Sequence, residues 1–287
     1  MTNPAIRDLF LGLSHSPAYQ AAVQALRAGT PPTAALGGLT RTAKALYLSL
    51  LWNDLQRPLL VLTESPKEAE ILAESVATFF RLVVQQHVGG RTQLLPAFDV
   101  LPGQHLSPHN DISEQRAVAL WRMATGRASI TIAPVMAALW RTESRDFYRQ
   151  LTLTLRNNDE IAPEDLAEYL QAIGFDRREP VDMVGDFSQR GGILDVFPPE
   201  SERPVRIEFF GDSIESMRLF DVESQRSVLK VPDCQILPLT ELPRTQELTR
   251  ELGDWALEGG WEFYAAKVRP RNGTIAELSG YETIRRE

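Results

Sequence analysis

The segment from Gly38 to Ala45 has residue types that could bind the phosphates of a nucleotide. A phosphate-binding loop needs a glycine before its lysine, so that backbone amides can close around the phosphates, and a serine or threonine after the lysine to hold magnesium. Ala43 and Ala45 stand at those two positions, and only Gly38 and Lys44 fit the pattern. We therefore expect neither nucleotide hydrolysis nor a bound cofactor. The simpler interpretation is a strand-to-helix turn followed by a surface lysine.

A second group of residues could bind another protein. In the predicted strand 205–210, three apolar side chains alternate with Arg206, Glu208 and Phe210, so these last three share the face away from the core. An aromatic side chain flanked by arginine is typical of protein interfaces, and arginine binds a carboxylate with two parallel hydrogen bonds. The alternative is that a helix or loop of the same domain covers Phe210 and that the arginines are solvated.

The residues before this strand complete the predicted binding surface. An antiparallel pairing with the preceding strand places Asp195 opposite Arg206. A β-bulge at the glycine pair 191–192 would turn Arg190 to the same face, because glycine tolerates the dihedral angles that a bulge requires. We therefore predict one binding surface formed by Arg190, Arg206 and Phe210.

The composition limits what such a surface could bind. The chain has 287 residues, of which 43% are hydrophobic, and a formal net charge of −8. It can bury a sizeable core in two domains or one large one, and its acidic balance does not favour a broad electrostatic grip on nucleic acid. The single cysteine, Cys234, cannot form an internal disulfide and suits a reducing cytoplasm. No apolar run approaches the roughly 20 residues of a membrane span.

Strand and helix patterns alternate through the first half of the chain, which predicts a parallel sheet with crossover helices. Strands are expected at 34–38, 58–63, 93–95 and 128–133. Helices are expected at 4–13, 17–27, 42–55, 112–125 and 135–140, and another begins after residue 65. Ser65, followed by proline and by Glu68, has the pattern of a helix start. Asp111 is expected to cap the helix 112–125 in the same way.

The pattern changes near Arg145 to antiparallel strands with one helix, which predicts a second, α+β domain. Strands are expected at 151–155, 193–197, 205–210, 213–221 and 227–231, and the helix at 163–173. Helical patterns return at 246–257, and the charged run 283–287 is expected to be helical and to have been cut from a longer chain. The predicted domains are 1–144, 145–236 and a truncated return segment to the first domain, 237–287.

Short motifs spread along the chain carry a resemblance to a known family. They are LPAFD at 95–99, LP at 101–102, SPHNDI at 107–112, Arg116, RGGILDVFP at 190–198, RIEFF at 206–210, FD at 220–221 and SQR at 224–226. Together they resemble the amino-terminal region of bacterial transcription-repair coupling factors (Mfd), over nearly the whole chain. That region is itself similar to UvrB, the damage-verification subunit of the excision nuclease. The resemblance implies a UvrB-like parallel-sheet domain, similar to a degenerate P-loop NTPase or helicase domain, with a smaller inserted domain of antiparallel strands.

The resemblance also implies a function. In this family the inserted domain binds UvrA through residues that match Arg190, Arg206 and Phe210. The chain would be a UvrA-recruiting adaptor that links stalled RNA polymerase to nucleotide excision repair in the cytoplasm, and not itself an enzyme. RNA polymerase and DNA would be contacted only through carboxy-terminal domains that this sequence lacks, including the ATP-dependent translocase and a domain that masks the UvrA-binding surface. No catalytic residue, metal site or membrane partner is implied.

Two alternatives stay open. A UvrB-type, nucleotide-dependent helicase or damage-verification fragment would bind ATP through Lys44. Against it, the phosphate loop that works in UvrB is degenerate here, and the tyrosine-rich hairpin with which UvrB probes DNA has only a short segment, 98–111, without tyrosine in its place. A non-specific DNA-binding module would instead bind with an affinity that falls steeply with salt.

Overall fold

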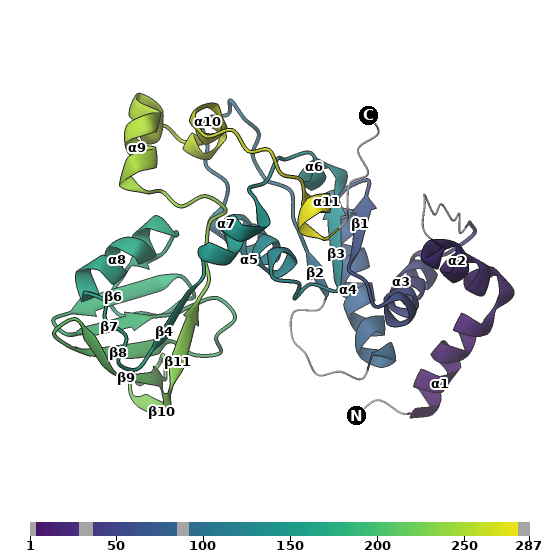
Figure 1. Cartoon of the computed structure of the whole chain (residues 1–287), viewed down its shortest axis with the longest axis horizontal. Helices are drawn as coiled ribbons and strands as arrows, with labels where there is room; N and C mark the ends of the chain where they lie inside the picture. The colour runs from purple at the N-terminus through teal and green to yellow at the C-terminus, as the bar shows by residue number, and fades with distance from the viewer. Residues whose placement is uncertain (1–3, 29–36, 85–91, 281–287) are drawn as a thin grey trace. The chain divides into compact units, whose positions relative to one another are not determined.

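A computed structural model describes residues 4–28, 37–84 and 92–280. The chain divides into two compact units (Figure 1). Unit 1 comprises residues 1–97, 122–142 and 273–287, and unit 2 comprises residues 98–121 and 143–272. Parallel strands in unit 1 and mainly antiparallel strands in unit 2 confirm the mixed α/β class predicted from the sequence. The predicted domain limits, 1–144, 145–236 and 237–287, stay a prediction.

The sheet of unit 1 has three described strands, all parallel. Their order across the sheet is β1 (Leu59–Thr63), β3 (Ile130–Pro134) and β2 (Thr92–Leu94). All five residues of β3 are buried, as expected for a central parallel strand that is covered on both faces. The predicted parallel sheet is confirmed for these strands, whereas the first expected strand, 34–38, falls mostly outside the described residues.

The described helices of unit 1 are α1 (Pro4–Gly12), α2 (Pro17–Arg27), α3 (Arg41–Leu55), α4 (Pro66–Val83), α6 (Val135–Ala138) and α11 (Ile275–Leu278), with a 3-10 turn at Leu13–His15. The hydroxyl of Ser65 accepts a hydrogen bond from the backbone N–H of Glu68, so the predicted start of α4 is confirmed. Leu50 of α3 and Val76 of α4 pack with Ile132 of β3 in one buried apolar cluster.

Helix α5 (Asn110–Ala124) begins two residues earlier than predicted. The backbone N–H groups of Ile112 and Ser113 both donate to the carbonyl of His109, at 3.0 Å. Asp111 therefore lies inside the first turn, and its predicted position as the amino-terminal cap is wrong. Its carboxylate still favours the helix, because the amino-terminal turn carries a partial positive charge.

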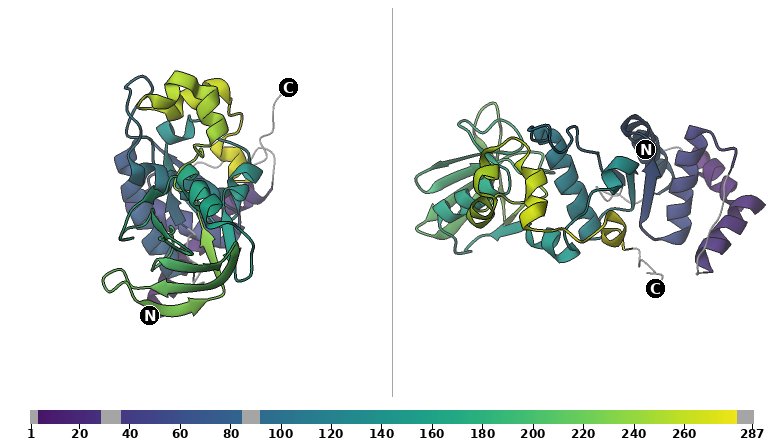
Figure 2. Two further views of the ribbon diagram at one scale, coloured as in Figure 1. Left: turned by 90° about the vertical axis from the view of Figure 1, so that its left-hand side faces the viewer. Right: turned by 90° about the horizontal axis from the view of Figure 1, so that it is seen from above.

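Unit 2 is built on a six-stranded sheet. In order across the sheet its strands are β10 (Ser227–Val231), β9 (Ser213–Phe220), β8 (Val205–Phe210), β7 (Ile193–Val196), β6 (Asp186–Arg190) and β5 (Asp176–Arg177). Helix α8 (Pro163–Ala172) lies on one face of this sheet (Figure 1, Figure 2), where Leu166 and Leu170 pack with Leu194 and Ile207. The predicted antiparallel arrangement with one helix is confirmed, although β5 and β6 were not among the predicted strands.

The pairing of β7 with β8 has the predicted register. Asp195 lies opposite Arg206, and Val196 lies opposite Val205. Since side chains alternate between faces, the two valines point to the core beneath α8 and the charged pair points to the other face. We call this other face, which carries Asp195 and Arg206, the outer face.

The strands β6 and β7 form a tight hairpin. Arg190 pairs with Ile193, so Gly191 and Gly192 are its two-residue turn, with Gly191 at φ +56°. The predicted β-bulge at these glycines is wrong, because both residues form the turn, and Gly191 supplies the positive φ that the turn requires. Arg190 nevertheless reaches the outer face, since it pairs with Ile193 two residues from Asp195.

Unit 2 contains further elements around this sheet. These are the antiparallel pair β4 (Leu153–Arg156) and β11 (Asp233–Ile236), the helices α7 (Arg145–Gln150), α9 (Gln246–Leu252) and α10 (Trp261–Val268), and a 3-10 turn at Gly253–Leu257. The fully buried Arg116 of α5 forms an ion pair with Glu241, which ties α5 to the segment after β11. Within the described ranges no helix has the length and apolar character needed to cross a membrane. The predicted helix at 283–287 lies outside them.

Candidate protein-binding site

A row of charged side chains crosses the outer face of the six-stranded sheet. Asp195 of β7 lies opposite Arg206 of β8, and Arg206 lies opposite Arg218 of β9. Directly opposite residues on one face are close enough for their side chains to interact. Strand pairing therefore brings these charges together, and the predicted place of Arg206 on this face is confirmed.

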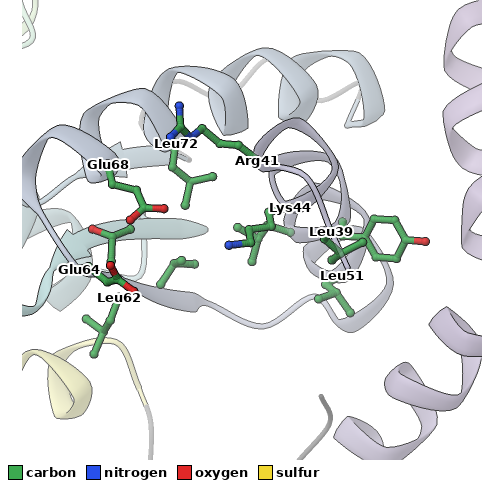
Figure 3. Close-up of a pocket in the computed structure, with 12 residues that line it drawn as sticks. Leu39, Arg41, Lys44, Leu51, Leu62, Glu64, Glu68 and Leu72 are labelled. Carbon is green, nitrogen blue, oxygen red and sulfur yellow. The ribbon is translucent and has the colours of Figure 1, made fainter. Parts of the chain in front are cut away.

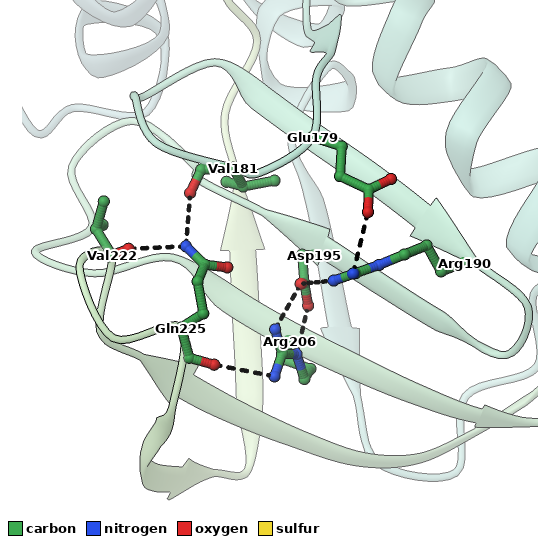
Figure 4. A network of polar contacts seen from close by, with 7 residues as sticks. All are labelled: Glu179, Val181, Arg190, Asp195, Arg206, Val222 and Gln225. Carbon is green, nitrogen blue, oxygen red and sulfur yellow. Dashed lines mark hydrogen bonds and ion pairs between the residues drawn. The ribbon is translucent and has the colours of Figure 1, made fainter.

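Asp195 and Arg206 form a two-pronged ion pair (Figure 4). The Nε and Nη2 groups of Arg206 each donate to one oxygen of Asp195, both at 2.7 Å. Asp195 is buried and the side chain of Arg206 is only 18% exposed. The hydrogen bonds to Asp195 raise the pKa of the Arg206 guanidinium above its ordinary value. This geometry is the strong, bidentate form of an arginine–carboxylate contact.

Arg206 also holds the loop between β9 and β10. Its Nη1 group donates to the carbonyl of Gln225 at 3.3 Å, and its guanidinium lies over the ring of Phe220 at 4.8 Å from the ring centre. The side-chain amide of Gln225 donates in turn to the carbonyls of Val222 and Val181. Arg206 is therefore held within its own domain, where three of the five N–H donors of its guanidinium are engaged.

Arg190 is placed differently on the same face. Its side chain is 53% exposed, and its Nη1 atom lies 3.1 Å from the carboxylate of Glu179, which is 57% exposed. Its Nη2 atom lies 3.6 Å from Asp195. Figure 4 shows Arg190 extending between these two carboxylates. An exposed ion pair of this kind contributes little to stability, so Arg190 can exchange its partner.

Phe210 is a largely exposed aromatic side chain on the outer face. It ends β8 beside the turn to β9, and 83% of its surface is exposed. The alternative that a described helix or loop covers Phe210 is therefore excluded. The alternation along β8 continues to its end, so Phe209 enters the core and Phe210 lies outside. Ile193, the hairpin partner of Arg190, is a second exposed apolar side chain at this end of the sheet.

Sequence reasoning missed two residues of this surface. Ile193 could have been found from the sequence, because alternation along the strand places it on the same face as Asp195 and on the face opposite to Leu194. Glu179 gave no signal, since it lies in the irregular segment before β6. The structure thus brings Arg190, Phe210 and Ile193 to one end of the outer face and leaves Arg206 as their mostly buried neighbour. That the three predicted residues bind UvrA stays a prediction.

The second candidate site lies at the start of α3, in unit 1. The backbone N–H of Ala43 donates to the hydroxyl of Thr40, and the N–H of Lys44 donates to the carbonyl of the same residue. These amides close the first turn of the helix and are not directed to a phosphate. Ala45 is buried in the core of unit 1. That the segment 38–45 is a degenerate phosphate-binding loop stays a prediction.

Lys44 lines a half-open cavity of 340 Å³ beside this turn (Figure 3). Arg41 and Lys44 line it from α3, Glu64 from the connection between β1 and α4, and Glu68 from the first turn of α4. Leucines form much of the rest of its wall. The two cations are balanced by two carboxylates, and a nucleotide triphosphate needs an excess of positive charge. In the ranges that the structure describes, no group of three or more potential metal ligands occurs.

The part of the chain that carries the antiparallel sheet is similar to a known domain family. Residues 153–242 match the family described as the UvrB interaction domain. The match covers α8 and the whole six-stranded sheet. We refer to residues 153–242 below as the UvrB interaction domain.

The chain as a whole is similar to transcription-repair coupling factors. It is 34% identical over 224 residues to that of Mycobacterium tuberculosis, which covers 75% of this chain and 17% of the relative. The factor of Myxococcus xanthus is 32% identical over 225 residues, covering 76% and 19%, and that of Escherichia coli 29% over 208 residues, covering 72% and 17%. The resemblance expected from the sequence is confirmed. The matched region spans less than a fifth of each of these relatives.

Proposed function

We propose that the chain is a UvrA-recruiting adaptor module. Two findings support this function: the match to the UvrB interaction domain and the similarity to transcription-repair coupling factors. The single observation that carries the proposal is the exposed end of the outer face, where Phe210 stands 83% exposed near Arg190. An isolated exposed aromatic with a nearby arginine has the composition of an interface hot spot.

Arg190, Arg206 and Phe210 would contribute to binding in different ways. Phe210 and Arg190 would contact UvrA, because both are exposed. Arg206 would act through its neighbours, since its side chain is mostly buried and already donates to Asp195 and to the Gln225 carbonyl. In this role it keeps β7, β8 and the loop 221–226 in the arrangement that presents the surface.

The direct test measures binding of the purified chain to purified UvrA. Phe210→Ala should weaken binding by about 30-fold or more, the effect of losing a hot-spot residue of about 2 kcal/mol. Val228→Ala is a matched control, because Val228 is also an exposed apolar residue of the same sheet, on β10. Equal affinity of the parent and Phe210→Ala, with the parent binding, would contradict the assignment of this surface. No binding by the parent would contradict the function itself.

A second candidate, a nucleotide-binding fragment of the UvrB type, is favoured by one observation, the cavity beside Lys44. It predicts that ATP raises the melting temperature of the parent and not of Lys44→Ala. We expect no such shift in either protein. The engaged amide of Ala43 and the carboxylates of Glu64 and Glu68 both oppose a bound triphosphate. We therefore propose that the chain by itself is not an enzyme.

The wider role is argued from the similarity to transcription-repair coupling factors. We propose that in the cytoplasm the module would couple repair to transcription, with RNA polymerase and DNA contacted by other parts of the longer relatives. An ATP-dependent translocase and a domain that masks the UvrA-binding surface would be among those parts. A pull-down of RNA polymerase by this chain would contradict this division of roles.

A further inference from the structure

Three arginines of the outer face differ in how firmly their own domain holds them. Arg206 is bonded to buried Asp195 and to the carbonyl of Gln225. Arg218 is partly buried and lies 3.3 Å from Glu208, whose carboxylate also accepts a hydrogen bond from Ser216. Both would have to give up well-packed partners in order to bind a second protein, and leaving such partners unpaired is costly.

Arg190 is held by a partner that it can release. Its contact with Glu179 at 3.1 Å joins two side chains that are each more than half exposed. The carboxylate of Glu179 would return to water when released, so little solvation is lost in the exchange. The more distant Asp195, at 3.6 Å, would remain beneath Arg190 and keep its guanidinium on the outer face.

We propose that Glu179 occupies, on Arg190, the place that a carboxylate of UvrA takes on docking, and that Phe210 and Ile193 enter an apolar depression beside that carboxylate. This inference rests on the proposed UvrA-binding function and adds the chemistry of the partner's surface. Arginine's planar fork of donors matches one carboxylate with two parallel bonds. A neutral partner would leave Glu179 in place and gain nothing from Arg190.

The apolar part of the surface lies at the same end of the sheet. Ile193 pairs with Arg190 across the β6–β7 hairpin and with Glu208 of β8. Phe210 lies two residues beyond Glu208 on the same strand. Both apolar side chains are exposed, so a partner that covers one end of the sheet buries them together with Arg190. Apolar area at the centre and a replaceable charge beside it is the usual anatomy of an interface.

The proposal predicts a gain of binding on removing a charge. Glu179→Gln frees Arg190 and should tighten binding to purified UvrA by about two- to fivefold, the range expected for an exposed ion pair. Glu202→Gln is the matched control, because it removes the same charge from an exposed position with no ion pair in the structure, in the loop before β8. The control should bind as the parent does.

A double-substitution cycle separates a released arginine from a general charge effect. In an Arg190→Gln background, Glu179→Gln should no longer change the affinity. Ile193→Ala should weaken binding about three- to tenfold, whereas Val228→Ala should not. The inference is overturned if Glu179→Gln leaves the affinity unchanged, tightens it equally without Arg190, or is matched by Glu202→Gln. Failure of the parent to bind UvrA would overturn the proposed function and this inference together.

Discussion

Arg206→Ala should destabilise the UvrB interaction domain far more than Arg190→Ala, although both substitutions remove an arginine from the same face. Removing Arg206 leaves the carboxylate of Asp195 buried, with Arg190 at 3.6 Å as its nearest cation. Breaking one partner of a buried ion pair costs about 3–5 kcal/mol, and we expect about 3 kcal/mol here because Arg190 stays close. Arg190→Ala removes an exposed pair and should cost about 1 kcal/mol or less.

The free energy of unfolding can be measured in this domain alone. Cys234 is the single cysteine of the chain and lies in the core beneath the outer face, so its reaction with a thiol reagent along a urea series reports unfolding of this domain. A loss of about 3 kcal/mol lowers the urea midpoint by about 1 to 3 M. Asp195→Ala should cost less than Arg206→Ala, since the partly exposed Arg206 can turn to water. Equal costs for Arg206→Ala and Arg190→Ala would refute this reasoning.

The same comparison decides how binding data should be interpreted. Arg206→Glu would place a second carboxylate against buried Asp195, and repulsion between like charges in a buried site would unfold part of the sheet. A loss of UvrA binding by that variant would not identify a contact. Arg206→Lys is the more informative substitution, because it keeps the charge and loses the two-pronged geometry.

Three further predictions follow from particular environments. Burial raises the pKa of the Cys234 thiol to about 12, so the native thiol should react with thiol reagents at pH 8 far more slowly than in urea; equal rates would contradict its place in the core. Burial also raises the pKa of Glu262 above its ordinary value of 4.5. The stability that its protonated form contributes is present below pH 4.5 and lost as the pH rises through the raised pKa. Glu262→Gln should therefore stabilise the chain at pH 7 and not at pH 4, as measured by urea unfolding; a constant difference across this range would exclude the titration. Finally, a side chain at Gly259 would overlap the carbonyl oxygen of His105, whereas Gly12 has open space around it. Gly259→Ala should lower stability by about 2 kcal/mol and Gly12→Ala should be nearly neutral, which thermal melts can compare.

The sequence carried enough information for the strand register but not for the roles of the charges. Alternation with period two places Arg206 and Asp195 on one face, and a slip of one residue would have sent Ile207 to solvent. The low exposure of Arg206 depends on a loop about twenty residues later, through the carbonyl of Gln225. The alternation of a single strand does not reveal such a contact, so an arginine held by its own domain and a solvated arginine give the same sequence pattern.

The strand β6 shows a second limit of sequence reasoning. Its residues Asp186–Arg190 contain only one apolar side chain, Phe187, and read as a loop. The strand forms because Phe187 enters the core and because Asp186 accepts hydrogen bonds from the backbone N–H groups of Asp182 and Met183. A Gly-Gly pair fits both a bulge and a two-residue turn, and only the presence of a strand before it selects the turn.

Asp195 affects both the stability of the domain and the availability of Arg190 for a binding partner. The carboxylate holds Arg206 by two bonds of 2.7 Å and approaches Arg190 only to 3.6 Å. A buried carboxylate must be paired, and Arg206 meets that need without Arg190. Arg190 is therefore attracted to the outer face without being fixed there, and its second neighbour, Glu179, is exposed. Arg206 is structural because it pairs with the buried carboxylate of Asp195, and Arg190 is exchangeable because it does not. Exchanging these two roles would require moving Asp195 itself.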